Sequence, residues 1–217
     1  MNNFFYIVPD FSYENCYLGN NICGIDEAGR GPLAGPVVAA CVELDLSFNY
    51  SDINDSKKIT PIKRSKIYKF LIDNVKYGIG VVDNDVIDRI NILEATKLAM
   101  LKSYQDFISK YQKLPEILLI DGNFKPFELC DNLKLIKPII KGDQKSLSIA
   151  ASSIIAKEYR DLLMNQYHLN FPQYEFNRHK GYPTKNHIAK IKQYGIIKIH
   201  RHSFGPIKAL IDNKTDI

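Results

Sequence analysis

The alternation of apolar and polar positions predicts short strands separated by longer helices. The first strand is expected from Ile22 to Glu27, and a second, rich in β-branched residues, from Pro36 to Leu46. The turn between them carries three glycines and a proline, which predicts an antiparallel hairpin with a long loop. Three further runs are predicted as strands: Tyr77 to Val82, Glu116 to Ile120 and Leu133 to Lys141. The second of these is apolar on both faces, as in buried parallel strands, and Pro138 places the third near a sheet edge or a strand end.

Helical periodicity appears between these strands. A helix is expected to begin at Thr60-Pro61, with proline in its first turn, and to run to about Asn74. Another is expected to begin at Asn91, because Asn91 and Glu94 have the spacing of a capping box. A stripe at helical spacing should face the core: Leu98, Leu101, Tyr104, Ile108 and Tyr111.

A long helix is expected from about Ser146 to Tyr167, and its small first residues indicate close packing. A further helix is expected near Thr184 to Tyr194. The order of two strands, helix, strand, helix, two strands and helix predicts an α/β fold with a mixed sheet covered by helices. With 217 residues, the chain fits one domain of roughly 150–200 residues and an appendage. We expect an N-terminal extension (1–20), a main domain (21–170) and a C-terminal helical region (171–217).

The composition, 45% hydrophobic and 24% charged, is that of an ordinary globular protein. The longest apolar runs, Val37 to Val42 and Ile117 to Ile120, are far short of the ~18 residues that a membrane span needs. The N-terminus lacks a basic segment, so no secretory signal is expected. The four cysteines (Cys16, Cys23, Cys41 and Cys130) form no C-x-x-C pair, which argues against a zinc site or a disulfide framework. A cytoplasmic protein with reduced thiols and no membrane association is the prediction.

The net charge of +5 is unevenly distributed along the chain. From Arg178 to Ile217, nine Lys/Arg stand against two Asp/Glu, a balance of +7; the rest carries 20 against 22, or −2. A basic C-terminal region suits a protein that binds a polyanion. A solvated basic helix without a ligand accounts for the charge equally well.

Acidic residues recur where the predicted strands end. Asp26 and Glu27 end the first strand, Asp121 ends the fourth, and Asp143 follows the fifth. Strand ends in a shared sheet converge, and two charges about 4 Å apart repel by on the order of 4 kcal/mol at an effective dielectric near 20. Divalent cations relieve such repulsion, and all-oxygen ligands favour Mg²⁺ or Mn²⁺ over zinc. Two such ions can clamp the attacking and leaving oxygens of a phosphodiester. The alternative for any single strand-end Asp is a turn residue or helix cap.

Eight blocks of sequence, all in order, resemble bacterial ribonuclease HII. They are GIDEAGRGPLAGPVV (24–38), NDSKK (54–58), NILEATKLAM (91–100), LLIDGN (118–123), KGD (141–143), SIAASSIIAKEYRD (148–161), FPQYEFNRHKGYPTKNH (171–187) and HRHSFGP (200–206). The resemblance runs from about Ile22 to Leu210, so the set is far more specific than any single motif.

This resemblance implies a ribonuclease H-like fold, with a five-stranded mixed sheet flanked by helices and a basic C-terminal region that completes the substrate groove. It implies an endonuclease that hydrolyses the RNA strand of RNA–DNA hybrids and nicks DNA duplexes 5′ of single embedded ribonucleotides, leaving 3′-hydroxyl and 5′-phosphate ends. Such an enzyme removes misincorporated ribonucleotides and RNA primers. The implied cofactors are two divalent cations, Mn²⁺ or Mg²⁺.

By motif position, the catalytic, metal-binding carboxylates are Asp26, Glu27, Asp121 and Asp143. The spacing from Asp121 to Asp143 is longer than the family pattern leads one to expect. Asp161 is therefore the alternative fourth acid, unless it is a structural partner of Arg160 or of another neighbour.

The resemblance also assigns substrate contacts. Gly29, Arg30 and Gly31 match the family's Gly-Arg-Gly, which reads the ribose 2′-hydroxyl; glycine lets a backbone approach closely, and the 2′-hydroxyl is the group that separates RNA from DNA. Arg30 can bind a phosphate bidentately. Tyr182 matches a tyrosine that packs on the sugar next to the ribonucleotide. Phosphate contacts, or else solvated surface charges, are the basic residues Lys57, Lys58, Lys145, Arg178, Lys180 and Lys185.

Other interpretations of these patterns are weaker. Gly29-x-Gly31-x-x-Ala34 fits a dinucleotide fingerprint, but that motif requires a helix where a strand is predicted. His200-x-His202 could bind a metal, although in a basic tail it is more often a phosphate neighbour or plain surface. A non-catalytic hybrid-binding module would not need four acids. The related ribonuclease HIII usually carries a separate N-terminal domain, for which residues 1–20 leave no room. We expect a monomer without a stable protein partner.

Overall fold

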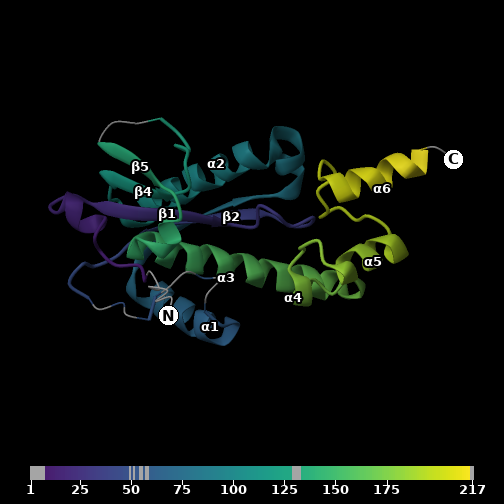
Figure 1. The fold of residues 1–217 in the computed structure, drawn as a ribbon, viewed down its shortest axis with the longest axis horizontal. Coiled ribbons are helices and arrows are strands. Elements are labelled where there is room, and N and C mark those ends of the chain that lie inside the picture. Colours follow the sequence, from purple (N-terminus) through teal and green to yellow (C-terminus); the bar gives the residue numbers. More distant parts are fainter. Residues whose placement is uncertain are drawn as a thin grey trace, which may run out of the picture.

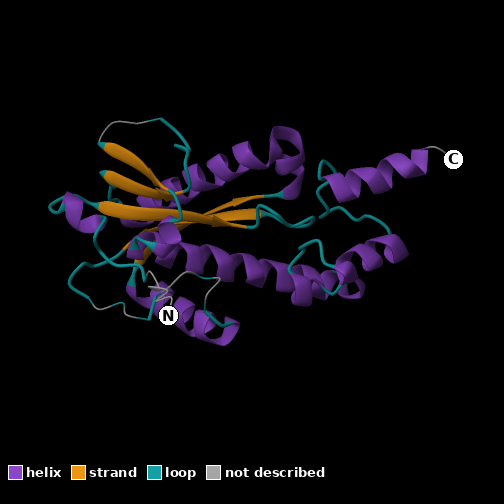
Figure 2. Cartoon of the chain, in the orientation of Figure 1, coloured by secondary structure: helices purple, strands orange, loops and turns teal. Residues whose placement is uncertain are grey.

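The structure, a computed structural model, describes residues 8–48, 50, 52–53, 56, 59–128 and 133–215. At its centre lies a sheet of strands (Figure 2). The sheet has five strands in the order β3-β2-β1-β4-β5. The strands are β1 (Ile22–Ala28), β2 (Val37–Glu43), β3 (Lys76–Val82), β4 (Ile117–Asp121) and β5 (Leu135–Ile139). All five predicted strands are confirmed, with ends shifted by a few residues.

The sheet is mixed, as predicted. β1 pairs antiparallel with β2 and parallel with β4, while β2 pairs antiparallel with β3 and β4 parallel with β5. The apolar residues of β4 are buried on both faces, as expected for a parallel strand. Pro138 lies in β5 at the edge of the sheet, where a residue without an N–H is tolerated.

Helices cover both faces of the sheet (Figure 1). The helix α2 (Asn84–Tyr111) packs on one face, and α1 (Pro61–Asn74) and α3 (Leu147–Asn170) pack on the other. Glycines in the strands allow this close contact: a Cβ added at Gly80 would lie 1.9 Å from the Ala99 carbonyl oxygen, and one at Gly24 would lie 2.3 Å from the carbonyl carbon of Ser148. The two long helices therefore rest directly on the backbone of the sheet.

Side-chain caps begin three helices at the predicted positions. The Thr60 hydroxyl oxygen accepts a hydrogen bond from the backbone N–H at the first turn of α1, and Ser146 does the same for α3. Thr184 caps α5 (Lys185–Tyr194) by accepting from the His187 N–H. These bonds satisfy backbone donors that would otherwise have no partner.

The prediction for α2 was wrong about its start. The helix begins at Asn84, and Asn91 forms a kink within it, with a φ of 67°. The Asn91 side chain nevertheless accepts hydrogen bonds from the N–H groups of Leu93 and Glu94, so it caps the second segment as predicted. Of the predicted core stripe, Tyr104 is buried and the others are partly buried; the fully buried centre of this face includes Ala99, Met100 and Phe107.

The C-terminal region forms a small cluster of helices at one end of the molecule (Figure 1). It contains a single 3-10 turn (Pro172–Tyr174), α4 (Phe176–His179), α5 and α6 (Gly205–Thr215). α6 was not predicted from the sequence. Its apolar residues pack together with Leu33 and Ala34 from the turn after β1 and with Met164 from α3. Among the helices described, none is both long and apolar enough to cross a lipid bilayer.

Candidate active site

The predicted acidic residues lie at the carboxyl ends of adjacent strands. Asp26 and Glu27 are near the carboxyl end of β1, which ends at Ala28, and Asp121 is the last residue of β4. Ile25 of β1 pairs with Ile120 of the parallel strand β4, so the next residues, Asp26 and Asp121, occupy neighbouring positions at the same edge of the sheet. Asp143 lies in the short 3-10 turn Gly142–Gln144 after β5, held there because the Gly142 N–H donates to Asp121 Oδ1 at 2.7 Å.

The charges of these acids influence one another. The pKa of Asp26 is raised well above its usual range, first because the carboxyl group is buried and next because Glu27 and Asp121 carry like charges nearby. The Glu27 N–H, which donates to Asp26 Oδ1 at 2.7 Å, opposes the rise, and the charge of Asp143 adds to it. A bound cation would replace this repulsion by attraction.

The donor set fits a hard divalent cation, since Asp26, Glu27, Asp121 and Asp143 offer only carboxylate oxygens. Among the residues that the structure describes, however, no three acidic, histidine or cysteine side chains already stand at metal-holding distances. The four acids thus share one edge of the sheet, and cation binding would have to draw their side chains together.

Asp161, the alternative fourth acid, belongs to a different group of charges. It forms ion pairs with Lys157 at 2.8 Å and with Arg64 at 3.5 Å. Arg64 also pairs with Glu158 at 2.6 Å. Asp143, in contrast, is one of the charges that raise the pKa of Asp26. The structure therefore brings Asp143 to the acidic edge and places Asp161 in an ion-pair network on α3.

The Gly29–Gly31 turn and Tyr182 both line a cavity of about 260 Å³. Glu27 also lines this cavity, so the cavity adjoins the acidic edge of the sheet. A Cβ added at Gly31 would lie 3.9 Å from Tyr182 Cε1. Arg30 is half exposed and pairs with Glu27 at 3.3 Å. The structure thus brings together the turn and the tyrosine that the sequence placed about 150 residues apart.

Four further polar residues line this cavity and were missed in the sequence: Ser56, Arg64, Ser153 and Lys157. Ser153 and Lys157 line it from α3, and Arg64 lines it from α1. The Lys157 ammonium lies 5.6 Å from the centroid of the Tyr182 ring. The signal that could have revealed two of them is their spacing, because residues four apart share one face of a helix.

The predicted phosphate contacts are spread over different environments. Arg178 is exposed and pairs with Glu175 at 3.6 Å, and Lys185 is exposed at the start of α5. The Lys180 ammonium donates to Asn165 Oδ1, and burial lowers its pKa. Lys145 is partly buried. Lys57 and Lys58 lie outside the described residues.

The interpretation of the His200-x-His202 pair as a phosphate neighbour or plain surface was wrong for His200. Its ring is fully buried and stacks with His187 at 5.4 Å between centroids, and His187 stacks with His179 at 4.3 Å. Burial is the first cause that lowers the pKa of His187 to about 3 and that of His200 to about 4. His202 is exposed, so the two histidines of the His-x-His pair point to different environments.

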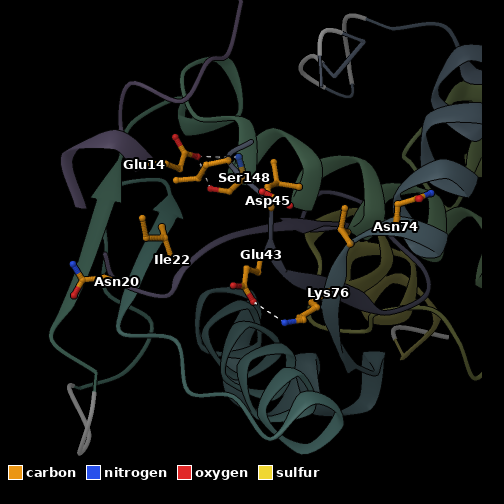
Figure 3. A pocket seen from close by; sticks show the side chains of 11 residues that line it. Glu14, Asn20, Ile22, Glu43, Asp45, Asn74, Lys76 and Ser148 are labelled. Atoms are coloured by element: carbon orange, nitrogen blue, oxygen red, sulfur yellow. Dashed lines mark hydrogen bonds and ion pairs between the residues drawn. The ribbon is translucent and has the colours of Figure 1, made fainter. Parts of the chain in front are cut away.

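A larger hollow, of about 530 Å³, lies at the other end of the strands (Figure 3). It is lined by the start of β1 and β3 and the end of β2, far along the sheet from Asp26. Its charged groups have structural partners: Glu14 accepts hydrogen bonds from Ser146 and Ser148 at the start of α3, and Glu43 pairs with Lys76 at 3.9 Å (Figure 3). We assign the chemistry to the acidic edge instead.

Comparison with solved structures first defines the class of protein. The chain matches the crystal structure of the ribonuclease H2 from Pyrococcus horikoshii OT3 with a TM-score of 0.72, at 23% identity, over 91% of this chain and 100% of that one. It matches the crystal structure of Bst-RNase HIII in complex with Mn²⁺ with a TM-score of 0.67, at 19% identity, over 93% of this chain and 73% of that one. The expected ribonuclease H-like fold is confirmed.

Sequence comparison then identifies the family. The model of the family described as Ribonuclease HII matches residues 23–206. A ribonuclease HII from Macrococcus caseolyticus is 50% identical over 200 residues, which cover 92% of this chain and 72% of that relative. The chain belongs to the ribonuclease HII family, and it is accordingly an enzyme, a nuclease of the ribonuclease H type.

Proposed function

We propose that this endonuclease hydrolyses the RNA strand of RNA–DNA hybrids and nicks DNA duplexes on the 5′ side of single embedded ribonucleotides. The products carry 3′-hydroxyl and 5′-phosphate ends, and the biological task is the removal of misincorporated ribonucleotides and RNA primers in the cytoplasm. One observation carries this proposal: the acidic edge formed around Asp26 directly adjoins the cavity lined by the Gly29–Gly31 turn and Tyr182.

Four carboxylates would hold the cofactors, two Mn²⁺ or Mg²⁺ ions: Asp26, Glu27, Asp121 and Asp143. When bound, these ions supply an activated water molecule and stabilise the charge on the departing 3′-oxygen. The all-oxygen donor set and the raised pKa of Asp26 support this assignment. The similar fold of Bst-RNase HIII, crystallised with Mn²⁺, also supports it.

The residues of the cavity select and orient the substrate. The Gly29–Gly31 turn contacts the ribose 2′-hydroxyl, because glycine lets backbone groups come within hydrogen-bonding distance. Tyr182 packs against the neighbouring sugar, and its ring lies beside the Lys157 ammonium. Arg30 exchanges its ion pair with Glu27 for a phosphate of the bound strand, where a guanidinium can donate two parallel hydrogen bonds. The basic C-terminal region supplies sequence-independent attraction to the backbone.

The test uses an end-labelled DNA duplex with one ribonucleotide, incubated with the protein in Mg²⁺, in Mn²⁺ and in chelator. Wild type should produce one nick that requires the metal. Asp26→Asn should abolish it while leaving hybrid binding largely intact. Asp85→Asn is the matched control, because this carboxylate is exposed on α2 and forms an exposed ion pair with Arg89; it should cleave normally.

Three results would contradict parts of the proposed function. Retained cleavage by Asp26→Asn would refute the carboxylate assignment. Cleavage of a long hybrid without a nick at the single ribonucleotide would refute the role of the turn and Tyr182 at the junction. Binding of both duplexes without cleavage would make a non-catalytic hybrid-binding module the better description.

A further inference from the structure

Two arginines beside the Gly29–Gly31 turn are completely buried. Arg160, on α3, and Arg201, in the segment between α5 and α6, each have 0% of their surface exposed. Burying a guanidinium costs several kcal/mol unless it is well hydrogen-bonded. Their described hydrogen bonds all go to backbone carbonyl oxygens, so each side chain holds a segment of backbone in place.

Arg201 holds the Gly-Arg-Gly turn from the C-terminal side. Its Nη2 donates to the Gly29 carbonyl at 2.6 Å, its Nη1 to the Arg30 carbonyl at 2.9 Å and its Nε to the Gly35 carbonyl at 2.9 Å. The backbone is joined at the same place, because the Arg201 N–H donates to the Leu33 carbonyl at 2.8 Å. One side chain thus connects both ends of the loop after β1.

Arg160 holds the same loop from α3. Its Nε donates to the Pro36 carbonyl at 2.9 Å and its Nη2 to the Ala34 carbonyl at 3.1 Å, while Nη1 donates to the Lys180 carbonyl at 3.0 Å. The guanidinium carbon lies 5.9 Å from the centroid of the Tyr182 ring. Arg160 therefore links the loop to the segment that presents Tyr182.

A guanidinium suits this position better than any other side chain. It offers five N–H donors in a rigid planar fork, which can reach several carbonyls at fixed directions, whereas a lysine ammonium is a single point with a flexible stem. Burial lowers the pKa of Arg201 to about 9, which leaves it charged at neutral pH. Phe204 covers the guanidinium, with the ring centroid 5.0 Å from Cζ.

We propose that Arg201, together with Arg160, is a positioning residue for ribonucleotide recognition: its three hydrogen bonds fix the shape in which the Gly29–Gly31 turn meets the 2′-hydroxyl. This inference rests on the proposed function, in which the turn contacts that hydroxyl. The basic C-terminal region then has a second task besides attracting phosphates, because it sets the selectivity of the catalytic domain for RNA.

The experiment measures selectivity rather than activity alone. Fluorescence anisotropy in chelator gives the dissociation constants for a DNA duplex with one ribonucleotide and for the same duplex without it. We expect wild type to prefer the ribonucleotide duplex by about tenfold, the effect of one or two hydrogen bonds. Arg201→Lys keeps the charge but loses the fork, and it should reduce the preference to below about threefold. Phe204→Leu removes the ring over the guanidinium, keeps an apolar side chain against the neighbouring core, and should give an intermediate preference.

The control is Tyr174→Phe. The Tyr174 hydroxyl donates to the carbonyls of Tyr194 and Gly195 at 3.1 and 2.8 Å, so its loss weakens the same C-terminal region without touching the turn. A general loss of stability would lower the melting temperature in all three variants, but it would not change the ratio of the two dissociation constants. The control should keep the wild-type ratio.

Different outcomes separate the two proposals. If wild type nicks and prefers the ribonucleotide while Arg201→Lys and Phe204→Leu keep the full preference, the positioning role is overturned and the function stands. If Arg201→Lys does not fold, Phe204→Leu decides by the same ratio. If wild type neither nicks nor prefers the ribonucleotide, the proposed function is overturned, and this inference with it.

Discussion

The two glycines of the Gly-Arg-Gly turn should respond in opposite ways to substitution by alanine. Gly29 has a φ of +98°, and a Cβ there would lie 2.1 Å from Arg160 Nε and 2.8 Å from the Pro36 carbonyl oxygen. Gly31 has no positive φ, and its Cβ would meet only the Tyr182 ring at 3.9 Å. Glycine is needed at 29 by the fold itself. At Gly31 the structure leaves open space, and we expect the ribose of the substrate to occupy it.

The size of each effect follows from these contacts. At Gly29, alanine in the left-handed region costs about 1–2 kcal/mol, and displacing the buried Arg160 guanidinium leaves groups unsatisfied at about 1–3 kcal/mol. The sum of roughly 2–5 kcal/mol corresponds to a fall in melting temperature of about 4–20 °C for a domain of this size. Gly31→Ala should change stability by less than about 0.5 kcal/mol. Its methyl group should nevertheless lower kcat/KM by about 100-fold, because it shifts the reacting sugar.

Thermal unfolding and initial cleavage rates on the single-ribonucleotide duplex test this pair together. Gly29→Ala should lose stability, and Gly31→Ala should keep its melting temperature but lose activity. An active Gly31→Ala would refute contact between the turn and the ribose. An equal loss of stability in both variants would contradict the geometry of the turn.

Three other predictions concern separate groups. Tyr182→Ala should reduce cleavage at single ribonucleotides by about tenfold, the scale of a lost stacking contact, but cleavage of long hybrids much less; equal losses in initial rate would remove its junction role. Asp143→Asn should abolish cleavage and Asp161→Asn should retain most of it, so the reverse result in the nicking assay would make Asp161 the fourth acid. The pKa values of His187 and His200, about 3 and about 4, lie below the ordinary 6.5, so the unfolded chain binds more protons in that interval. The free energy of unfolding should therefore be highest above pH 6.5 and should fall as the pH is lowered toward 4. A urea midpoint that does not change between pH 7.5 and 5 would contradict the assignment of His187 and His200 as buried and neutral.

Local chemistry made much of the fold predictable. The strands follow from apolar runs, and Thr60 and Ser146 begin helices at the expected places because their hydroxyls accept backbone hydrogen bonds. Asp26 and Asp121 could be placed together because residues that end parallel strands share one edge of the sheet. These features depend on neighbours in sequence or on regular strand geometry.

The missed features depend on tertiary contacts. The first segment of α2 was not predicted, because Asn91 is a strong signal for the start of a helix. A positive φ at Asn91 lets helix run on both sides of this residue, and the sequence gives no sign of that conformation. The burial of Arg160 and Arg201 was not predicted, since only their carbonyl partners, far away in sequence, make it tolerable. His200 was misplaced for a similar reason, because its stacking partners come from separate segments.

The chemical groups at the cut ends test most directly whether the protein hydrolyses the bond on the 5′ side of a ribonucleotide. A duplex with one ribonucleotide is cleaved in Mn²⁺, and both fragments are analysed for their position and terminal groups. We expect a nick 5′ of the ribonucleotide, with a 3′-hydroxyl that a DNA polymerase can extend and a 5′-phosphate on the ribonucleotide. A nick on its 3′ side that leaves a 2′,3′-cyclic phosphate would contradict the account, because the 2′-hydroxyl would then be the nucleophile instead of the group that the Gly29–Gly31 turn recognises.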